Sequence, residues 1–319
     1  MRAAVIDSPG SISVREVPFA PLPGECTIRV LRAGICGTDL QLLEGYAGFT
    51  GIPGHEFVGV VDSVASPGDA KWLGRRVVGE INVGCGDCRR CREGVKEHCD
   101  RRAVVGIRGR PGAFAEYLSL PPANLHPVPE SIDDDAAVFV EPVAAACRIL
   151  EQVSIPPGTR VAVLGDGRMG LIVGQVLGTA TKDVTVIGRH ETKLDLARAF
   201  GLTAARANDI DGQFDVVVDV TGRADGLRQA VALTRPRGTV VMKTTAHDAE
   251  VFESWPVVVH EISLVGSRCG PFKAAIDAIA SGSVQVRSLV TRVAKLEEAV
   301  QAFDDARTSL KILLAPRTV

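Results

Sequence analysis

The apolar residues of the chain follow two rhythms, and the change from one to the other falls near residue 157. Before it, short segments rich in β-branched residues alternate with Gly and Pro, which is typical of an irregular, barrel-type β domain. This pattern predicts strands at residues 5–6, 12–17, 26–30, 57–64, 76–81 and 114–118. Ser131 and the aspartates at 133–135 then form a helix start signal, and we expect a helix over residues 136–152 apart from Pro142.

After Gly158 the chain alternates between continuous apolar runs and amphipathic stretches, which is typical of a parallel sheet covered by helices on both faces. The predicted strands are 161–164, 184–187, 214–220, 239–242 and 263–265, and the predicted helices include 191–200 and 224–233. The tail predicts a helix at 296–306 and a last strand at 311–314. Because a single terminal strand needs a partner, we expect it to complete a sheet of the first domain.

The first strand of the second half ends in Gly165-x-Gly167-x-x-Gly170, and an apolar stretch suited to a helix follows. This is the arrangement of a dinucleotide-binding βαβ unit. Gly165 makes the turn, Gly167 lets the backbone approach a pyrophosphate, and Gly170 lets helix and strand pack closely. The N–H groups at the helix start, around Arg168 and Met169, then face the phosphates. The glycine-rich turn therefore predicts a nucleotide cofactor.

Composition and charge exclude several other classes of protein. With 319 residues the chain is long enough for about two domains, and a net charge of −2 offers no electrostatic footprint for nucleic acid or an anionic membrane. No uncharged apolar run reaches the roughly 18 residues that span a bilayer. An acid at Asp7 comes too early for a signal peptide, so we expect a cytoplasmic protein.

Four of the eight cysteines lie close together, at Cys85, Cys88, Cys91 and Cys99. In a reducing compartment such a cluster indicates metal ligands rather than disulfides. Four thiolates at these spacings close a tetrahedral, structural zinc site, which leaves no position for substrate. An iron–sulfur cluster is the alternative, although the fourth cysteine comes after seven residues and no proline follows it. We expect a zinc lobe at about residues 84–100.

A second set of candidate ligands is spread over three segments of the chain. The set contains Cys36 and Thr38 in one segment, His55 and Glu56 in the next, and Glu141 before a proline. Taken singly, each residue has a structural interpretation, as a small buried side chain, a loop histidine or a charge at a helix end. Together they supply a thiolate, an imidazole and carboxylates, which are the ligand types of a catalytic zinc.

In combination these motifs resemble those of zinc-dependent medium-chain alcohol dehydrogenases, in the branch of polyol and threonine dehydrogenases. The Gly-His-Glu segment, the four-cysteine lobe, the Glu-Pro-Val segment and the glycine-rich turn follow the family order over nearly the whole chain. The resemblance implies an α/β protein with a GroES-like catalytic domain, residues 1–140 and 272–319, and an inserted Rossmann domain, residues 141–271. It also implies an active site in the cleft between the two domains.

The resemblance implies a role for each candidate ligand. Cys36 and His55 would ligate the catalytic zinc, and Glu56 would be a ligand that exchanges with water. Glu141 would take the remaining carboxylate position. Asp39 would bond the far nitrogen of His55 and fix its tautomer.

The resemblance also implies a route for the proton of the alcohol. Thr38 occupies the position of the family's hydroxyl, which takes this proton while hydride passes to the nicotinamide. Many relatives carry a histidine shortly afterwards that relays the proton to solvent, whereas this chain has Gln41. Because glutamine does not titrate, we expect release through water or the ribose.

The end of the second strand of the parallel sheet favours NADP over NAD. An NAD enzyme places an acid there, to accept hydrogen bonds from the ribose. Here Gly188, Arg189 and His190 follow, and they leave room and positive charge for a 2′-phosphate. The nearest carboxylate, Glu191, falls in the first turn of a helix, where acids commonly offset the dipole. The alternative is that Arg189 is a solvated loop residue and that the enzyme uses either cofactor.

Three further candidates follow strands at the same edge of the sheet. The resemblance places Thr221 and Thr244, which follow strands 214–220 and 239–242, near a ribose of the cofactor. Arg268 follows strand 263–265, from which it could reach the pyrophosphate or a substrate anion.

The sequence as a whole predicts an enzyme with two zinc ions per chain that transfers hydride between NADP(H) and a secondary alcohol, polyol or sugar hydroxyl. An NAD-linked threonine or polyol dehydrogenase is the alternative within the class. A non-catalytic redox sensor that binds zinc and nucleotide is the alternative outside it, and the intact candidate ligands argue against a sensor. Because relatives commonly associate through the edge of the Rossmann sheet, we expect a homodimer or homotetramer.

Overall fold

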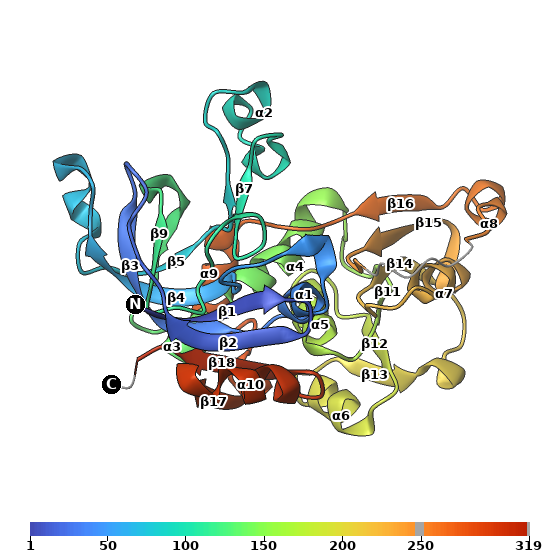
Figure 1. Ribbon diagram of the computed structural model, residues 1–319. Coiled ribbons are helices and arrows are strands. Elements are labelled where there is room, and N and C mark those ends of the chain that lie inside the picture. The colour runs from blue at the N-terminus through green and yellow to red at the C-terminus, as the bar shows by residue number, and fades with distance from the viewer. Residues whose placement is uncertain (246–251, 318–319) are drawn as a thin grey trace. The chain divides into compact units, whose positions relative to one another are not determined.

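The computed structural model describes residues 1–245 and 252–317. The chain divides into two compact units, which can be followed by colour in Figure 1. The first unit comprises Met1–Glu141 and Val286–Val319, and the second comprises Pro142–Gln285. Within the described ranges, every helix is too short or too polar to cross a membrane.

A seven-stranded sheet is the main element of the first unit. Its strands lie in the order β10-β5-β4-β3-β18-β17, and β9 also pairs with β3. Their bounds are β3 Cys26–Gly34, β4 Glu56–Ser63, β5 Arg76–Gly79, β9 Tyr117–Leu120, β10 Leu125–Pro127, β17 Val290–Lys295 and β18 Lys311–Ala315. Two small sheets accompany it: the hairpin of β1 Arg2–Ser8 with β2 Ser11–Glu16, and the trio of β6 Asn82–Val83, β7 Ala103–Val105 and β8 Gly109–Arg110.

The helices of this unit are short. They are α1 Gly37–Leu43, α2 Arg89–Arg92, α3 Asp134–Ala137 and α10 Ala299–Ala306. The single helix predicted over 136–152 is two helices, because α3 ends before Val138 and α4, Val140–Gln152, begins two residues later. Pro142 falls in the first turn of α4, where a missing N–H costs no helical hydrogen bond.

The last strand joins a sheet whose other strands come mostly from the first half of the chain. Strand β18 runs antiparallel to β3, with Leu313 opposite Gly34, and parallel to β17. This confirms the expectation that the C-terminal strand completes a sheet formed elsewhere. The strand predicted at 114–118 is wrong at its start, since the structure begins β9 at Tyr117. Phe114 instead pairs irregularly, with its N–H on the Pro53 carbonyl and its own carbonyl on the Ala4 N–H.

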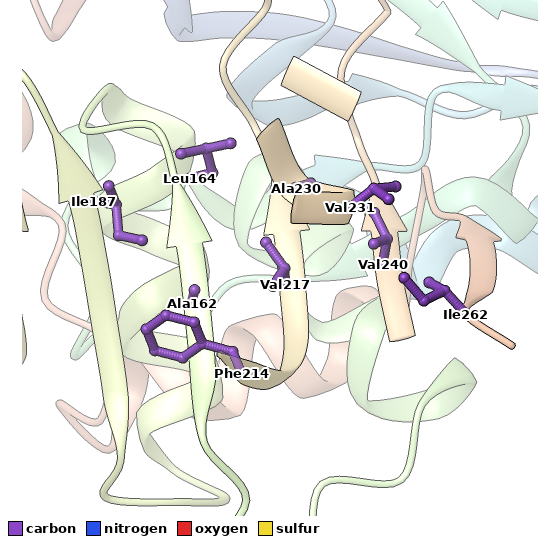
Figure 2. Packing of buried hydrophobic residues seen from close by; sticks show 9 residues of the cluster. All are labelled: Ala162, Leu164, Ile187, Phe214, Val217, Ala230, Val231, Val240 and Ile262. Atoms are coloured by element: carbon purple, nitrogen blue, oxygen red, sulfur yellow. The ribbon is translucent and has the colours of Figure 1, made fainter. Parts of the chain in front are cut away.

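The second unit is built on a parallel sheet with strand order β13-β12-β11-β14-β15-β16. The bounds are β11 Val161–Leu164, β12 Val184–Gly188, β13 Thr203–Arg206, β14 Phe214–Asp219, β15 Thr234–Met242 and β16 Ser263–Gly266. Apolar side chains of the strands and of α7, Gly226–Leu233, pack together in Figure 2. The five strands expected from apolar runs are all present. Edge strand β13 was missed because its sequence, Thr-Ala-Ala-Arg, has no large apolar residue.

The other helices of this unit are α5 Arg168–Gly178, α6 Glu191–Ala199, α8 Trp255–Val259 and α9 Phe272–Ala280. Helix α9 and the residues up to Gln285 belong here, although we expected residues 272–285 in the first domain. The side chain of Gln175 on α5 gives a reason, because it bonds both backbone groups of Gln285, donating at 3.0 Å and accepting at 2.7 Å. This contact between residues 110 positions apart is not readable from sequence pattern.

Candidate active site and cofactor site

Cys36 is held at the start of α1 by the carboxylate of Asp39. The Cys36 N–H donates to Asp39 Oδ2 at 2.8 Å, and the Gly54 N–H donates to Asp39 Oδ1 at 3.1 Å. Asp39 has no exposed surface, and it therefore ties two distant loops together in a buried position. Thr38 Oγ1 lies 4.0 Å from the Cys36 sulfur, so the hydroxyl and the thiol share this end of the helix.

His55 and Glu56 lie where the loop after Gly54 enters strand β4. Both are almost fully buried, with 4% and 1% of their surfaces exposed. The Nδ1 atom of His55 lies 3.3 Å from Asp39 Oδ1, as the resemblance implied. Burial lowers the pKa of His55, but the Asp39 carboxylate outweighs this effect and brings the pKa well above its ordinary value. The carboxylate thus orients the ring and increases its basicity, which suits a metal ligand.

Three candidate ligands converge on one point. The ligand atoms of Cys36, His55 and Glu56 all lie within 4.8 Å of one another. One sulfur, one imidazole nitrogen and one carboxylate form a donor set that fits a catalytic zinc, which keeps a coordination position for substrate. Glu141, at the second position of α4, is not part of this group in the described structure, so its role as a ligand stays a prediction.

Behind Glu56 lies a buried lysine that the sequence pattern did not single out. Lys311, the first residue of β18, has 1% of its surface exposed, and its ammonium pairs with the Glu56 carboxylate. Its Nζ also donates to the Ile35 carbonyl at 3.2 Å and lies 5.6 Å from the centre of the Phe139 ring. Burial lowers the pKa of Lys311 to about 8.

Space for this lysine depends on a glycine in the neighbouring strand. A Cβ atom at Gly34 would lie 2.4 Å from Lys311 Cε and 2.6 Å from its Nζ. Lys311 is the only charged residue in the run Lys-Ile-Leu-Leu of a predicted strand. A lysine at the first position of an apolar strand was therefore the signal that could have indicated a buried charge. Its partner could not be identified from the sequence, because Glu56 becomes a neighbour only when β18 lies beside β3.

The four cysteines of the predicted lobe also converge. Their sulfur atoms all lie within 4.8 Å of one another, with Sγ–Sγ distances of 3.9 Å for Cys85–Cys91, 3.7 Å for Cys88–Cys99 and 3.5 Å for Cys85–Cys99. A tetrahedral zinc with Zn–S bonds of about 2.3 Å has sulfur–sulfur edges of about 3.8 Å. These distances match, and an Arg101 N–H donates to the Cys85 sulfur at 3.2 Å. The lobe therefore fits a structural zinc.

The glycine-rich turn has the geometry that a dinucleotide needs. Gly165 has a φ of +127°, which only glycine adopts easily, and a Cβ at Gly170 would lie 1.8 Å from the Gly165 carbonyl oxygen. A Cβ at Gly167 would meet nothing within 4 Å. The N-cap residue of α5 is Gly167, which has no side chain to cap the helix, and Arg168 and Met169 follow it. The turn thus leaves open space at the N-terminus of a helix, where a pyrophosphate fits.

At the end of β12 the structure adds an acid that the sequence pattern did not assign there. Asp166, from the glycine-rich turn, lies against Gly188, and its Oδ2 accepts the N–H groups of Arg189 and His190, both at 2.7 Å. Burial raises the pKa of Asp166, but these two hydrogen bonds outweigh it and hold the pKa below its ordinary value. The Nδ1 atom of His190 lies 3.0 Å from the same carboxylate oxygen.

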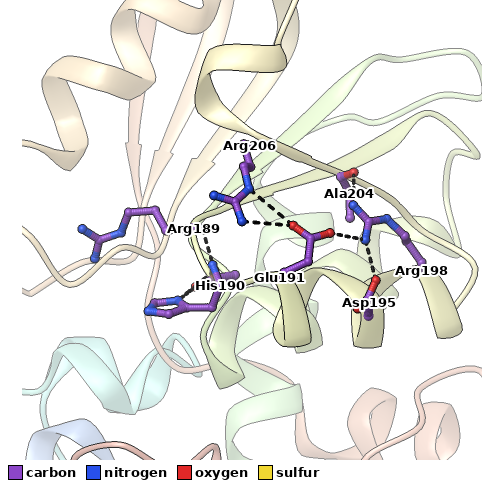
Figure 3. A network of polar contacts seen from close by, with 8 residues as sticks. Arg189, His190, Glu191, Asp195, Arg198, Ala204 and Arg206 are labelled. Carbon is purple, nitrogen blue, oxygen red and sulfur yellow. Dashed lines mark hydrogen bonds and ion pairs between the residues drawn. The ribbon is translucent and has the colours of Figure 1, made fainter.

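Glu191, the acid that follows, is occupied by two arginines. Its carboxylate pairs with Arg198 at 2.8 Å and with Arg206 at 3.3 Å. Figure 3 shows this network, with the Arg189 side chain extending away from it. Among the described residues, no carboxylate forms an ion pair with Arg189, so its guanidinium is available for an anionic ligand.

The remaining cofactor candidates are located as follows. Thr221 donates to Asp219 through both its N–H and its hydroxyl, and the Thr244 hydroxyl accepts the Gly222 N–H at 3.1 Å. The loops after β14 and β15 therefore meet at the carboxyl ends of their strands, where ligands bind in such sheets. Arg268 is exposed after β16.

Comparisons with known sequences match both halves of the chain to described families. The alcohol dehydrogenase GroES-like domain family matches residues 22–130, and the glucose dehydrogenase C-terminus family matches residues 134–315. The "probable D-xylulose reductase A" of Aspergillus clavatus is 30% identical, over 94% of this chain and 92% of that protein.

Two solved structures have the same fold over nearly their whole length. An alcohol dehydrogenase from Escherichia coli CFT073 complexed with NADH has a TM-score of 0.90 at 27% identity, and the match covers 99% of each chain. A zinc-binding dehydrogenase from Sinorhizobium meliloti 1021 bound to NADP has a TM-score of 0.88 at 30% identity, again with 99% coverage of each chain.

A GroES-like unit with a Cys-His-Glu site and a parallel nucleotide-binding sheet define a zinc-dependent dehydrogenase that acts on CH–OH groups with NAD(P). The chain belongs to the zinc-containing medium-chain alcohol dehydrogenase superfamily and is polyol dehydrogenase-like within it. The fold class and the family predicted from the sequence are thereby confirmed.

Proposed function

We propose that this dehydrogenase prefers NADP(H) and interconverts a secondary alcohol, polyol or sugar hydroxyl with its carbonyl. The observation that carries the catalytic part is the convergence of Cys36, His55 and Glu56 within 4.8 Å of one another. The carboxylate in this set, which is buried and paired with Lys311, supports a polyol-like enzyme, because the resemblance implies carboxylate ligands in that branch. The xylulose reductase similarity supports the same substrate class.

The proposed roles of the residues follow from their positions. Cys36 and His55 would hold the zinc, Glu56 would be an exchangeable ligand, and Glu141 would supply a further carboxylate. When bound, zinc lowers the pKa of the substrate hydroxyl and the nicotinamide accepts the hydride. Thr38, 4.0 Å from the Cys36 sulfur, would accept the proton of the hydroxyl and pass it to water or to the ribose.

The preference for NADP rests on Arg189. Strand β12 ends at Gly188 instead of an acid, Glu191 is paired with two arginines, and Arg189 has no carboxylate partner among the described residues. A 2′-phosphate would therefore meet one available cation and no acid on β12 itself.

Initial rates test the proposal directly. Zinc-saturated protein should reduce NADP⁺, followed at 340 nm, with at least one member of a panel of secondary alcohols, polyols and sugars. No turnover on the whole panel would favour the redox sensor. Faster turnover with NAD⁺ would favour the NAD-linked alternative.

Substitution of Arg189 isolates the cofactor preference. Arg189→Ala should weaken NADPH binding about tenfold, because a charge-assisted contact to phosphate is lost, and should leave NADH binding within about twofold. Binding is measured by the change in cofactor fluorescence. Equal losses for both cofactors would contradict a role at the 2′-phosphate.

We also propose a cytoplasmic homodimer or homotetramer. Metal-ligating thiolates are typical of reducing compartments, which supports the location. Exposed apolar side chains on α8 support association, since Trp255, Val258 and Val259 expose 59%, 74% and 64% of their surfaces.

A further inference from the structure

Asp166 occupies the place at the end of β12 where a Rossmann sheet ordinarily carries its ribose-binding acid. A Cβ atom at Gly188 would lie 2.3 Å from Asp166 Cβ and 2.5 Å from its Oδ2. Strand β12 therefore cannot carry a side chain at this position while Asp166 is present. The acid comes from the turn after β11 instead, one strand away.

The carboxylate of Asp166 faces the protein rather than solvent. Its side chain is 10% exposed, and Oδ2 accepts the N–H groups of both Arg189 and His190 at 2.7 Å. The His190 ring closes the arrangement from the side, with Nδ1 at 3.1 Å from Oδ1 and 3.0 Å from Oδ2. These contacts fix the backbone of the two residues that follow β12.

Around this turn the two acids have partners, whereas the guanidinium of Arg189 forms no ion pair with a described carboxylate. The negative charge of Asp166 is stabilised by two N–H groups and His190, and Glu191 is held by Arg198 and Arg206. The described carboxylates leave the guanidinium of Arg189 without an ion pair, and its side chain extends away from the network in Figure 3. The backbone that carries this cation is the backbone that Asp166 holds.

We propose that Asp166 is a positioning residue for cofactor discrimination, which holds the turn 188–190 so that Arg189 meets the 2′-phosphate of NADP(H). The inference rests on the proposed NADP preference and adds to it the residue that makes Arg189 effective. A carboxylate free to accept ribose hydroxyls would favour NAD. Here most of its acceptor capacity is used by the turn itself.

Affinity measurements without turnover test this role. Dissociation constants of NADPH, NADH and 2′-AMP are measured by fluorescence and calorimetry for the wild type, Asp166→Ala and Asp166→Asn. Asp166→Ala should weaken the binding of NADPH and of 2′-AMP about tenfold, and the binding of NADH by less than about twofold. Asp166→Asn keeps one oxygen that accepts N–H groups and should retain most of the preference. The control is Asp183→Ala, since Asp183 is a half-exposed acid that precedes the opposite end of β12.

A double-mutant cycle shows whether Asp166 acts through Arg189. In an Arg189→Ala background, Asp166→Ala should change NADPH affinity by less than about twofold, because the contact that it positions is already absent. Full additivity of the two substitutions would overturn the proposal.

The remaining outcomes of the affinity measurements distinguish failure of the Asp166 inference from failure of the proposed NADP preference. Tighter NADPH binding together with weaker NADH binding in Asp166→Ala would make Asp166 a ribose-binding acid and overturn the inference. Equal weakening of all three ligands would overturn it as well, because Asp166 would then be a structural residue without a part in discrimination. Discrimination that persists in Asp166→Ala contradicts only the inference. A wild type that binds NADPH no tighter than NADH contradicts the proposed NADP preference and the inference together.

Discussion

At the scale of single residues, the site depends on one buried ion pair. Lys311 and Glu56 expose about 1% of their surfaces each, and they lie on strands that flank β3 in the sheet. Removing one partner of such a pair leaves a charge without compensation in a low-dielectric interior, which costs more than the pair itself contributes. Lys311 therefore compensates the charge of Glu56 in this buried position.

Lys311→Met should lower the free energy of unfolding of the metal-free protein by about 3 kcal/mol, because Glu56 then lacks its cation. The double variant Lys311→Met/Glu56→Gln should recover a large part of this loss. Urea denaturation measures the free energy of unfolding of the wild type and of each variant, with zinc bound and after treatment with a chelator. Lys295→Met, on the exposed side of β17, serves as the control with an expected change below about 0.5 kcal/mol. A Lys311→Met variant as stable as the wild type would contradict the importance of the pair.

At the scale of elements, the cysteine lobe has little core of its own and relies on metal and on one anchoring acid. Helix α2 has four residues and no buried side chain. Glu80, just after β5, accepts from His126 on β10 at 2.7 Å and from Lys96 of the lobe at 2.6 Å. The lobe is thus joined to the main sheet through a charged contact.

Cys85→Ser should remove the structural zinc and leave the catalytic one. Metal analysis should fall from about two zinc ions per chain to about one, since a tetrahedral thiolate site seldom survives the loss of a ligand. The melting temperature should fall as well. Loss of both ions, or retention of both, would contradict two independent sites.

The anchoring acid predicts a pH dependence. Burial raises the pKa of Glu80, but hydrogen bonds from His126 and Lys96 outweigh it, so the pKa lies below its ordinary 4.5. The unfolded chain therefore takes up the proton first, and the contribution of Glu80 is complete above about pH 4.5 and lost as the pH falls through the lower, folded value. Glu80→Gln should be about 1 kcal/mol less stable than the wild type at pH 7 and equal to it near pH 3, measured by urea denaturation. A difference that persists at acid pH would contradict this assignment.

At the scale of the whole molecule, the parallel sheet ends in an edge that suits association. In the described ranges β16 pairs only with β15, and α8 before it carries the exposed Trp255, Val258 and Val259. An open strand edge and an exposed apolar patch are both features that another chain can cover.

Val258→Asp should shift the protein toward monomers, because a charge would be buried in the proposed interface. Light scattering coupled to size exclusion gives the mass in solution. Val300→Asp is the matched control, since Val300 is 49% exposed on α10 of the other unit, and it should leave the mass unchanged. A monomeric wild type would contradict the proposed oligomer.

The sequence by itself determined the architecture of the protein and the motifs of both proposed zinc sites. Parallel strands that are buried on both faces need continuous apolar runs, and glycines are required where a turn has positive φ or backbone atoms approach closely, as at Gly165 and Gly170. Cysteine spacing alone indicated the lobe, because its four ligands lie within one short segment.

The tertiary structure decided what depends on residues far apart in the chain. Lys311 meets Glu56 across 255 positions, Gln175 bonds the backbone of Gln285, and Asp166 fills the space beside Gly188 at the end of β12. Local pattern records burial and turn chemistry, whereas the partner of a buried charge is set by which strands become neighbours. That information is not periodic in the sequence, so only the folded chain supplies it.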